Sequence, residues 1–262
     1  MFMIKGSDHA NGRSPVRKLI VFDLDGTLAT SKQAINAEMS RLFVDLLGVS
    51  SVAVISGGDW PQFERQLLGE LPARGHYANL YLLPTSGTKF YRFDGVWSQI
   101  YADDFSPDQR ERVMAALTSA VADAGFADET IWGEQIEDRG SQITFSGLGQ
   151  EAAPDVKASW DPDVGKRNRL KALLDVQLPD FAVRIGGSTS IDITKPGIDK
   201  AYGINKLAGI SGCALSDMLF IGDALYPGGN DAPVRDAGVS TIAVEDIAET
   251  KLVIETIIKL AG

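Results

Sequence analysis

The chain has 262 residues, of which 44% are hydrophobic and 23% are charged, and its formal net charge is −10. This is the composition of a globular protein with enough apolar residues for a core. The negative charge argues against binding to nucleic acid or to an anionic membrane surface, because both would repel it. No apolar run approaches the roughly 20 residues of a bilayer span. The single cysteine, Cys213, cannot form an internal disulfide, which predicts a cytoplasmic protein.

The first part of the chain predicts alternating strands and helices. Residues up to about 16 are polar, and we expect them to form a loose N-terminal tail. The apolar run that follows, 18–22, predicts a parallel strand buried on both faces. The next elements are an amphipathic helix near 35–47, a strand at 52–55, a helix at 61–68 and a strand at 80–83. This order favours a parallel sheet with helices on its faces.

The middle of the chain has a different pattern. It predicts a hairpin at 90–100, a helix at 107–125, strands at 131–137 and 142–146, a helix at 161–174 and strands at 181–185 and 190–194. Hairpins separated by helices indicate a separate α+β unit. From Asp199 onward the α/β pattern returns, with a helix that begins near Lys200, strands at 218–221 and 241–244, and a last helix from about 248.

We therefore predict an α/β fold with a Rossmann-like core, a parallel sheet with helices on both faces. Residues 1–97 and 195–262 would form this core, and residues 98–194 would form an inserted α+β cap domain. A site between a core and an insert is a common place for a ligand pocket.

Reactive side chains follow the predicted core strands or open the next helix. They are Asp23, Asp25, Ser56, Lys200 and Asp223. In an open parallel sheet, ligands bind beyond the carboxyl ends of the strands. Three carboxylates at one edge would repel one another unless a cation lies among them, and Mg²⁺ is a hard ion that prefers oxygen ligands. A lysine, a serine and helix N-terminal amides suit a phosphate. The pattern predicts phosphoryl transfer in which a carboxylate attacks.

The motifs around these residues resemble those of a known superfamily. The segment Val21-Phe-Asp23-Leu-Asp25-Gly-Thr27-Leu28 resembles the first signature of the haloacid-dehalogenase-like phosphotransferases. Ser56, Lys200 and the pair Gly222-Asp223 with Asn230-Asp231 look like the second, third and fourth signatures. The longer segments 55–67, 184–192 and 222–231 are similar to the eukaryotic-type phosphomannomutases of that superfamily.

The resemblance implies a role for each core residue. Asp23 would be the nucleophile and a metal ligand, and Asp25 the general acid/base, whose backbone carbonyl would also bind Mg²⁺. Ser56 and Lys200 would hold the transferring phosphoryl group. Asp223 would complete the metal ligands, with Asp231 contributing through water. Further substrate contacts are expected from Gly57 and Asn230.

The cap residues bear on which molecule accepts the phosphoryl group. A mutase must hold the distal phosphate of a bisphosphate, preferably with arginine. In the phosphomannomutases the segment Ser-Pro-Ile-Gly-Arg supplies one such arginine, whereas this chain has Ser146-Gly-Leu-Gly-Gln150. The other candidate substrate contacts in the cap are Arg139, Lys157, Ser190 and Asp192.

Because Gln150 is neutral, we expect a phosphatase that hydrolyses a small phosphorylated substrate, such as a sugar phosphate, through an aspartyl-phosphate. A phosphomannomutase-type mutase is the alternative, and a non-catalytic phosphosugar-binding protein is a third. The phosphomannomutases pair through their caps, so the resemblance allows a monomer or a cap-mediated homodimer.

Overall fold

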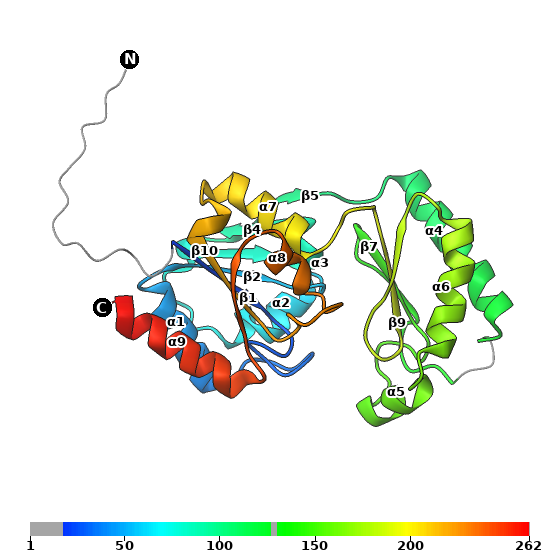
Figure 1. The fold of residues 1–262 in the computed structure, drawn as a ribbon, viewed down its shortest axis with the longest axis horizontal. Coiled ribbons are helices and arrows are strands. Elements are labelled where there is room, and N and C mark those ends of the chain that lie inside the picture. The colour runs from blue at the N-terminus through cyan, green and yellow to red at the C-terminus, as the bar shows by residue number, and fades with distance from the viewer. Residues whose placement is uncertain (1–17, 127–129, 262) are drawn as a thin grey trace, which may run out of the picture.

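The computed structural model describes residues 18–126 and 130–261, so the expected N-terminal tail lies outside the described residues. Figure 1 shows two lobes, one built from the two ends of the chain and one from its middle. The predicted α/β fold class is confirmed. No helix in these described ranges is long and apolar enough to cross a bilayer.

The larger lobe, called the core, contains one seven-stranded sheet in the order β11-β10-β1-β2-β3-β4-β5. Its strands are β1 Leu19–Asp23, β2 Ser51–Ile55, β3 Leu80–Leu83, β4 Lys89–Phe93, β5 Trp97–Ala102, β10 Met218–Gly222 and β11 Ser240–Ala243. The strands β1, β2, β3, β10 and β11 pair in parallel, and β4 and β5 add an antiparallel hairpin at one edge. All five residues of β1 are buried, as an apolar run inside a parallel sheet requires.

Helices cover both faces of the core sheet. The helices α1 Ala37–Leu47, α2 Trp60–Gln66 and α9 Ile247–Ala261 pack their apolar residues on one face. The helices α7 Lys200–Ser211 and α8 Ala232–Asp236 pack on the other, with the left-handed turn α3 Pro84–Gly87. Short 3-10 turns lie at Leu68–Glu70, Tyr77–Asn79 and Leu215–Asp217. This doubly covered sheet leaves the carboxyl ends of its parallel strands as the edge where a site can form.

The smaller lobe, called the cap, contains a four-stranded antiparallel sheet in the order β6-β7-β9-β8. Its elements are α4 Pro107–Ala124, β6 Ile136–Asp138, β7 Gln142–Ser146, α5 Pro154–Trp160, α6 Gly165–Gln177, β8 Ala182–Ile185 and β9 Ser190–Thr194. Ile143, Phe145, Ile191 and Ile193 pack against α4 and α6. Because side chains alternate along a strand, Gln142, Thr144 and Asp192 lie on the opposite face. In Figure 1 that face is turned toward the core. We propose that the cap is a separate domain.

Four local differences separate the sequence prediction from the structure. The strand β5 carries the core sheet to Ala102, so the boundary expected at residue 98 falls inside a strand. The strand expected at 131–137 is reduced to β6, because residues 132–135 bond to the turn at 146–151 instead of forming a regular ladder. The helix expected from 161 begins at Gly165, and the Asp161 carboxylate accepts from the backbone N–H groups of Lys166 and Arg167. The helix α5 was not predicted.

The two crossings between core and cap lie next to each other. Lys195 Nζ on the second crossing donates to the backbone oxygens of Asp103, at 3.2 Å, and Asp104, at 2.6 Å, on the first. The Asp103 carboxylate in turn accepts from the Tyr202 hydroxyl and pairs with Lys206, both on α7. These two crossings, called the hinge, are thereby tied to α7, the helix that begins with Lys200.

Gly203 lets α7 approach the rest of the core closely. A Cβ at this position would lie 2.6 Å from Ile55 Cδ1 and 2.6 Å from the Ser86 backbone oxygen. We expect Gly203→Ala to lower the free energy of unfolding by about 1–3 kcal/mol, because a rigid neighbour must move. Gly209→Ala on the same helix is the matched control, since no atom lies within 4 Å of its added Cβ. Urea unfolding of both variants checks this, and equal effects would contradict it.

Candidate active site

The turn after β1 brings two carboxylates together. Asp23 ends the strand and is only 4% exposed. Gly26 has φ +86°, and a Cβ there would lie 2.5 Å from Asp223 Oδ2, so the turn closes directly against Asp223 at the end of β10. Thr27 Oγ1 donates to Asp223 Oδ1 at 3.3 Å. Position 26 therefore requires glycine, both for its positive φ and for the close approach of Asp223.

Lys200 lies between two buried carboxylates. Asp199 caps α7 by accepting from the Tyr202 backbone N–H, and Lys200 is the first residue of the helix. Lys200 Nζ lies 2.6 Å from Asp23 Oδ1 and 2.5 Å from Asp231 Oδ1, and Lys200 is 2% exposed. The second Asp231 oxygen accepts from the Ala224 backbone N–H at 3.0 Å. The third and fourth predicted motifs thus meet at the nucleophile candidate.

Both burial and neighbouring charges shift the pKa values of Asp23 and Lys200. Burial raises the pKa of Asp23 to about 7, with the nearby Lys200 acting to lower it and Asp231 acting to raise it. Burial acts to lower the pKa of Lys200, but Asp23 and Asp231 more than compensate, so its pKa is raised. Lys200 therefore stays an ammonium group, which can balance one carboxylate but not three.

Asp23, Asp223 and Asp231 form a group that can hold a metal ion. One carboxylate oxygen from each lies within 4.8 Å of the others, and Asp223 is the most exposed of the three. An all-oxygen set suits a hard cation such as Mg²⁺. The Asp25 carboxylate, in contrast, is not in this group, because it accepts from groups on the other side of the turn, including the Lys32 backbone N–H. A metal contact from the Asp25 backbone carbonyl stays a prediction.

The loop that follows β2 carries Ser56 and Gly57. Ser56 Oγ accepts from the Gly58 backbone N–H at 3.1 Å, and its backbone oxygen accepts from Ser86. Thr85 donates its backbone N–H to the Gly58 oxygen at 2.8 Å. Thr85 and Ser86 both have positive φ, +48° and +56°, which is unusual for residues with a side chain. This left-handed turn holds the Ser56 loop at the end of its strand.

Arg139 joins the cap to that loop. Its Nη1 donates to the Gly57 backbone oxygen at 2.7 Å, and its Nη2 pairs with Glu137 at 2.7 Å. The side chain is 10% exposed, so it is not a solvated turn residue. On the same face of the cap sheet, Asp192 Oδ1 accepts from Thr144 at 2.7 Å and Gln142 at 3.0 Å. Burial raises the pKa of Asp192.

Gln150 meets lysines from both lobes. Lys32 Nζ of the core donates to Gln150 Oε1 at 3.2 Å, and Lys157 Nζ of the cap donates to the Gln150 backbone oxygen at 2.8 Å. Burial and the nearby Lys32 lower the pKa of Lys157. Within the described residues, neither ammonium group forms an ion pair. Lys32 was not predicted from the sequence, because a lysine in a loop is usually solvated. In the structure its φ is +59°, an unusual backbone conformation for a residue with a side chain.

Two predicted substrate contacts remain, Ser190 and Asn230. Ser190 is the first residue of β9 and is half-buried, and Asn230 is exposed in the turn before Asp231. Two other lysines near Lys200 in the sequence, Lys195 and Lys206, lie at the hinge rather than beside Asp23. The structure therefore brings together Asp23, Lys200, Asp223 and Asp231, with the Ser56 loop at the adjacent strand end.

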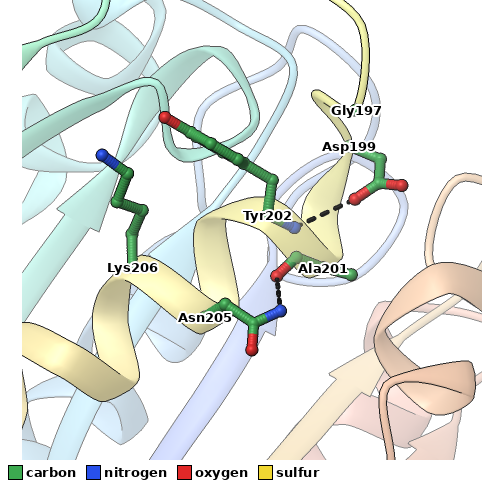
Figure 2. A pocket seen from close by; sticks show the side chains of 6 residues that line it. All are labelled: Gly197, Asp199, Ala201, Tyr202, Asn205 and Lys206. Carbon is green, nitrogen blue, oxygen red and sulfur yellow. Dashed lines mark hydrogen bonds between the residues drawn. The ribbon is translucent and has the colours of Figure 1, made fainter.

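A surface pocket of about 520 Å³ lies elsewhere, along α7 (Figure 2). Its lining includes Asp199, Ala201, Tyr202, Asn205 and Lys206. Asp199 accepts from the Tyr202 backbone N–H and Asn205 donates to the Ala201 oxygen, so these polar groups already serve the helix. The pocket contains none of the predicted site residues, and we do not assign the chemistry to it.

Comparison with known proteins gives a consistent match. A family model described as "Eukaryotic phosphomannomutase" matches residues 39–260. The chain is 25% identical to a phosphomannomutase of Dendrobium officinale over 248 residues, covering 91% of this chain and 94% of that protein. It is 26% identical to a phosphomannomutase of Schizosaccharomyces pombe over 249 residues, covering 90% and 93%.

Solved structures share the fold at lower identity. The chain is similar to the IMP-nucleotidase of Plasmodium falciparum, with a TM-score of 0.70 and 16% identity over 93% of this chain and 69% of that one. It is also similar to a haloacid dehalogenase-like hydrolase from Bacteroides thetaiotaomicron, with a TM-score of 0.61 and 17% identity over 92% and 99%. At such identities the likeness shows the fold alone.

Proposed function

Because the chain belongs to the eukaryotic phosphomannomutase family of the haloacid-dehalogenase-like superfamily, we propose that it is a Mg²⁺-dependent sugar-phosphate mutase of the phosphomannomutase type. The phosphatase expected from Gln150 has less support, because the similar curated proteins are named phosphomannomutases. We also propose a cytoplasmic location, on the single cysteine alone.

The proposed chemistry starts at Asp23. One Asp23 carboxylate oxygen attacks one phosphorus of a hexose bisphosphate, and the bond from that phosphorus to the sugar oxygen breaks, which leaves an aspartyl-phosphate and a hexose monophosphate. The Asp25 carboxyl gives its proton to that leaving oxygen. In the return step, the free hydroxyl of a bound hexose monophosphate attacks the aspartyl-phosphate and gives its proton to Asp25, which forms a hexose bisphosphate and regenerates Asp23.

Other residues stabilise the transferring group. Lys200 and the Ser56 loop would bind phosphoryl oxygens, as ammonium groups and hydroxyl or backbone donors do. Mg²⁺ held by Asp23 and Asp223, with Asp231 beside it, would neutralise charge on the same oxygens when bound. Gly57, Arg139, Ser190, Asp192 and Asn230 are the proposed contacts to the rest of the substrate.

The observation that carries the mutase over the phosphatase is the convergence of Lys32 and Lys157 on Gln150. A mutase must hold a second phosphate while the first reacts, and two ammonium groups from opposite lobes, which form no ion pair in the described part of the chain, can do so. They supply the positive charge that Gln150 lacks. The phosphatase stays the second candidate, because a lysine pair lacks the bidentate geometry of arginine.

An assay of both products tests the proposal. The purified protein with Mg²⁺ and mannose 1-phosphate, with and without a hexose bisphosphate, is followed for isomer and free phosphate together. We expect bisphosphate-dependent isomerisation that exceeds phosphate release. Phosphate release without isomer formation would overturn the mutase in favour of the phosphatase. Binding of the sugar phosphate with neither product would favour the non-catalytic alternative.

Lys157→Gln should separate the two activities. If Lys157 holds the distal phosphate, we expect isomerisation to fall by about 10- to 100-fold, since one lost charge-assisted bond is worth roughly 1.5–3 kcal/mol. Phosphate release should change less than about threefold, because a monophosphate needs no second anchor. Lys171→Gln, whose ammonium group pairs with Asp175 on α6, is the control. An equal fall in both activities would contradict a distal-phosphate role.

A further inference from the structure

We propose that Gln62 and Gln66 on α2 are positioning residues that hold the Asp25 carboxylate in the orientation needed for proton transfer. This inference rests on the proposed function, since it assumes that Asp25 is the general acid/base. Both glutamines lie in the segment 55–67, but neither was among the predicted site residues, and each reaches Asp25 across the turn after β1.

Three N–H donors fix both oxygens of the Asp25 carboxylate. Gln62 Nε2 donates to Oδ2 at 2.7 Å, and Gln66 Nε2 donates to Oδ1 at 3.1 Å. The Lys32 backbone N–H donates to Oδ1 at 2.7 Å. A carboxylate held at both oxygens cannot rotate without breaking at least one of these bonds. General acid/base catalysis depends on such placement, because the proton must lie within hydrogen-bond reach of the reacting oxygen.

Gln66 must be an amide at this position. It is 2% exposed, and its Nε2 donates both to Asp25 and to the Gln33 backbone oxygen, at 2.8 Å. Both partners are acceptors, so the nitrogen has to face them. Its Oε1 is buried with no partner in the described residues. An unpaired buried oxygen costs free energy, and its retention here is explained if the two donated bonds are needed for catalysis.

Gln62 also contacts the Ser56 loop, at Gly58. Its amide packs on Gly58, where a Cβ would lie 2.2 Å from Gln62 Oε1. Gln62 and Gln66 are four residues apart, so they lie on one face of α2. That helix is anchored at its start, because Asp59 pairs with Lys89 at 2.8 Å and Trp60 stacks on Tyr91 with ring centroids 3.9 Å apart. The pair thus couples Asp25 to a fixed helix beside the Ser56 loop.

The test compares two phosphate esters that differ in their need for a proton. An alkoxide leaving from mannose 1-phosphate must be protonated, whereas 4-nitrophenolate leaves without a proton. For Gln62→Leu and Gln66→Glu we expect turnover of the sugar phosphate to fall by about 10- to 100-fold, the scale of a misplaced acid/base. First-turnover release of 4-nitrophenolate should change less than about threefold. KM for the sugar phosphate should stay within about threefold, because neither side chain grips the phosphate.

Two controls keep the outcome decisive. Glu64→Gln, an exposed residue on the outer side of α2, should change neither rate. Gln66→Glu replaces two donors with a carboxylate in a buried place and can disturb folding, so the half-buried Gln62→Leu must show the same pattern with an unchanged melting temperature. Equal losses on both esters, or no loss on the sugar phosphate, would overturn the positioning role. A wild-type protein that reacts with neither ester would instead overturn the proposed function, and this inference with it.

Discussion

Asp23→Asn is expected to abolish phosphoryl transfer, with turnover reduced by roughly 10⁴-fold or more, as for loss of a covalent nucleophile in other enzymes. Asparagine keeps the shape of the side chain and an oxygen that can accept from Lys200, but its amide does not attack phosphorus. The measurement is turnover of mannose 1-phosphate together with transfer of labelled phosphate to the protein. Neither should be detectable in the variant.

Asp25→Asn provides the comparison for this experiment. It leaves the nucleophile in place, so the labelled protein should still form from an ester with a good leaving group, while turnover of the sugar phosphate falls. The Asp23→Asn protein should also remain folded, because it keeps one of the two buried carboxylates that pair with the single Lys200 ammonium group. Turnover that survives in Asp23→Asn would mean that another residue is the nucleophile.

Lys200→Met is expected to have the largest effect on stability. It would leave Asp23 and Asp231 as buried carboxylates, 4% and 0% exposed, with their shared ammonium group removed. Breaking a buried ion pair by removing one partner costs about 3–5 kcal/mol. Urea unfolding without Mg²⁺ measures this loss, and activity should disappear as well. Lys206→Met, on the same helix but half-buried at the hinge, should cost less than about 1 kcal/mol.

A second substitution identifies the cause of that loss. Adding Asp231→Asn to Lys200→Met removes one of the two unpaired carboxylates, and we expect it to restore part of the stability but none of the activity. A Lys200→Met protein as stable as wild type would show that the two carboxylates tolerate burial without the lysine. Restored activity in the double variant would contradict the proposed role of Lys200 at the phosphoryl group.

The sequence was sufficient for the parts of the fold governed by local pattern. The apolar run before Asp23 indicated an inner strand, and the placement of Asp23, Lys200 and Asp223 at strand or helix ends predicted their meeting at one edge. The cap helix at Pro107–Ala124 was equally clear, because Ser106 and Gln109 form a capping box at its start.

The residues that were missed act through tertiary contacts. Gln62, Gln66 and Lys32 look like solvated polar residues in a sequence, and only the packed turn after β1 aims them at Asp25 and Gln150. A weak signal was present, since Gln66 lies between the buried Phe63 and Leu67, where a polar residue needs a reason. The shortness of β6 could not be predicted from the sequence either, because backbone hydrogen bonds to a distant turn limit this strand.

The neighbouring crossings at Asp103 and Lys195 also bear on how such a protein can diversify. Because the insert leaves and rejoins the core at nearly the same place, its two ends already meet, and the seven-stranded sheet has no gap where the insert begins. An ancestral core can therefore gain, lose or exchange this module as a single unit without re-pairing a strand. Under the proposed roles, the choice of substrate and of phosphoryl acceptor is inherited largely with the exchangeable module, whereas the nucleophile Asp23 and its neighbours are inherited with the sheet that remains.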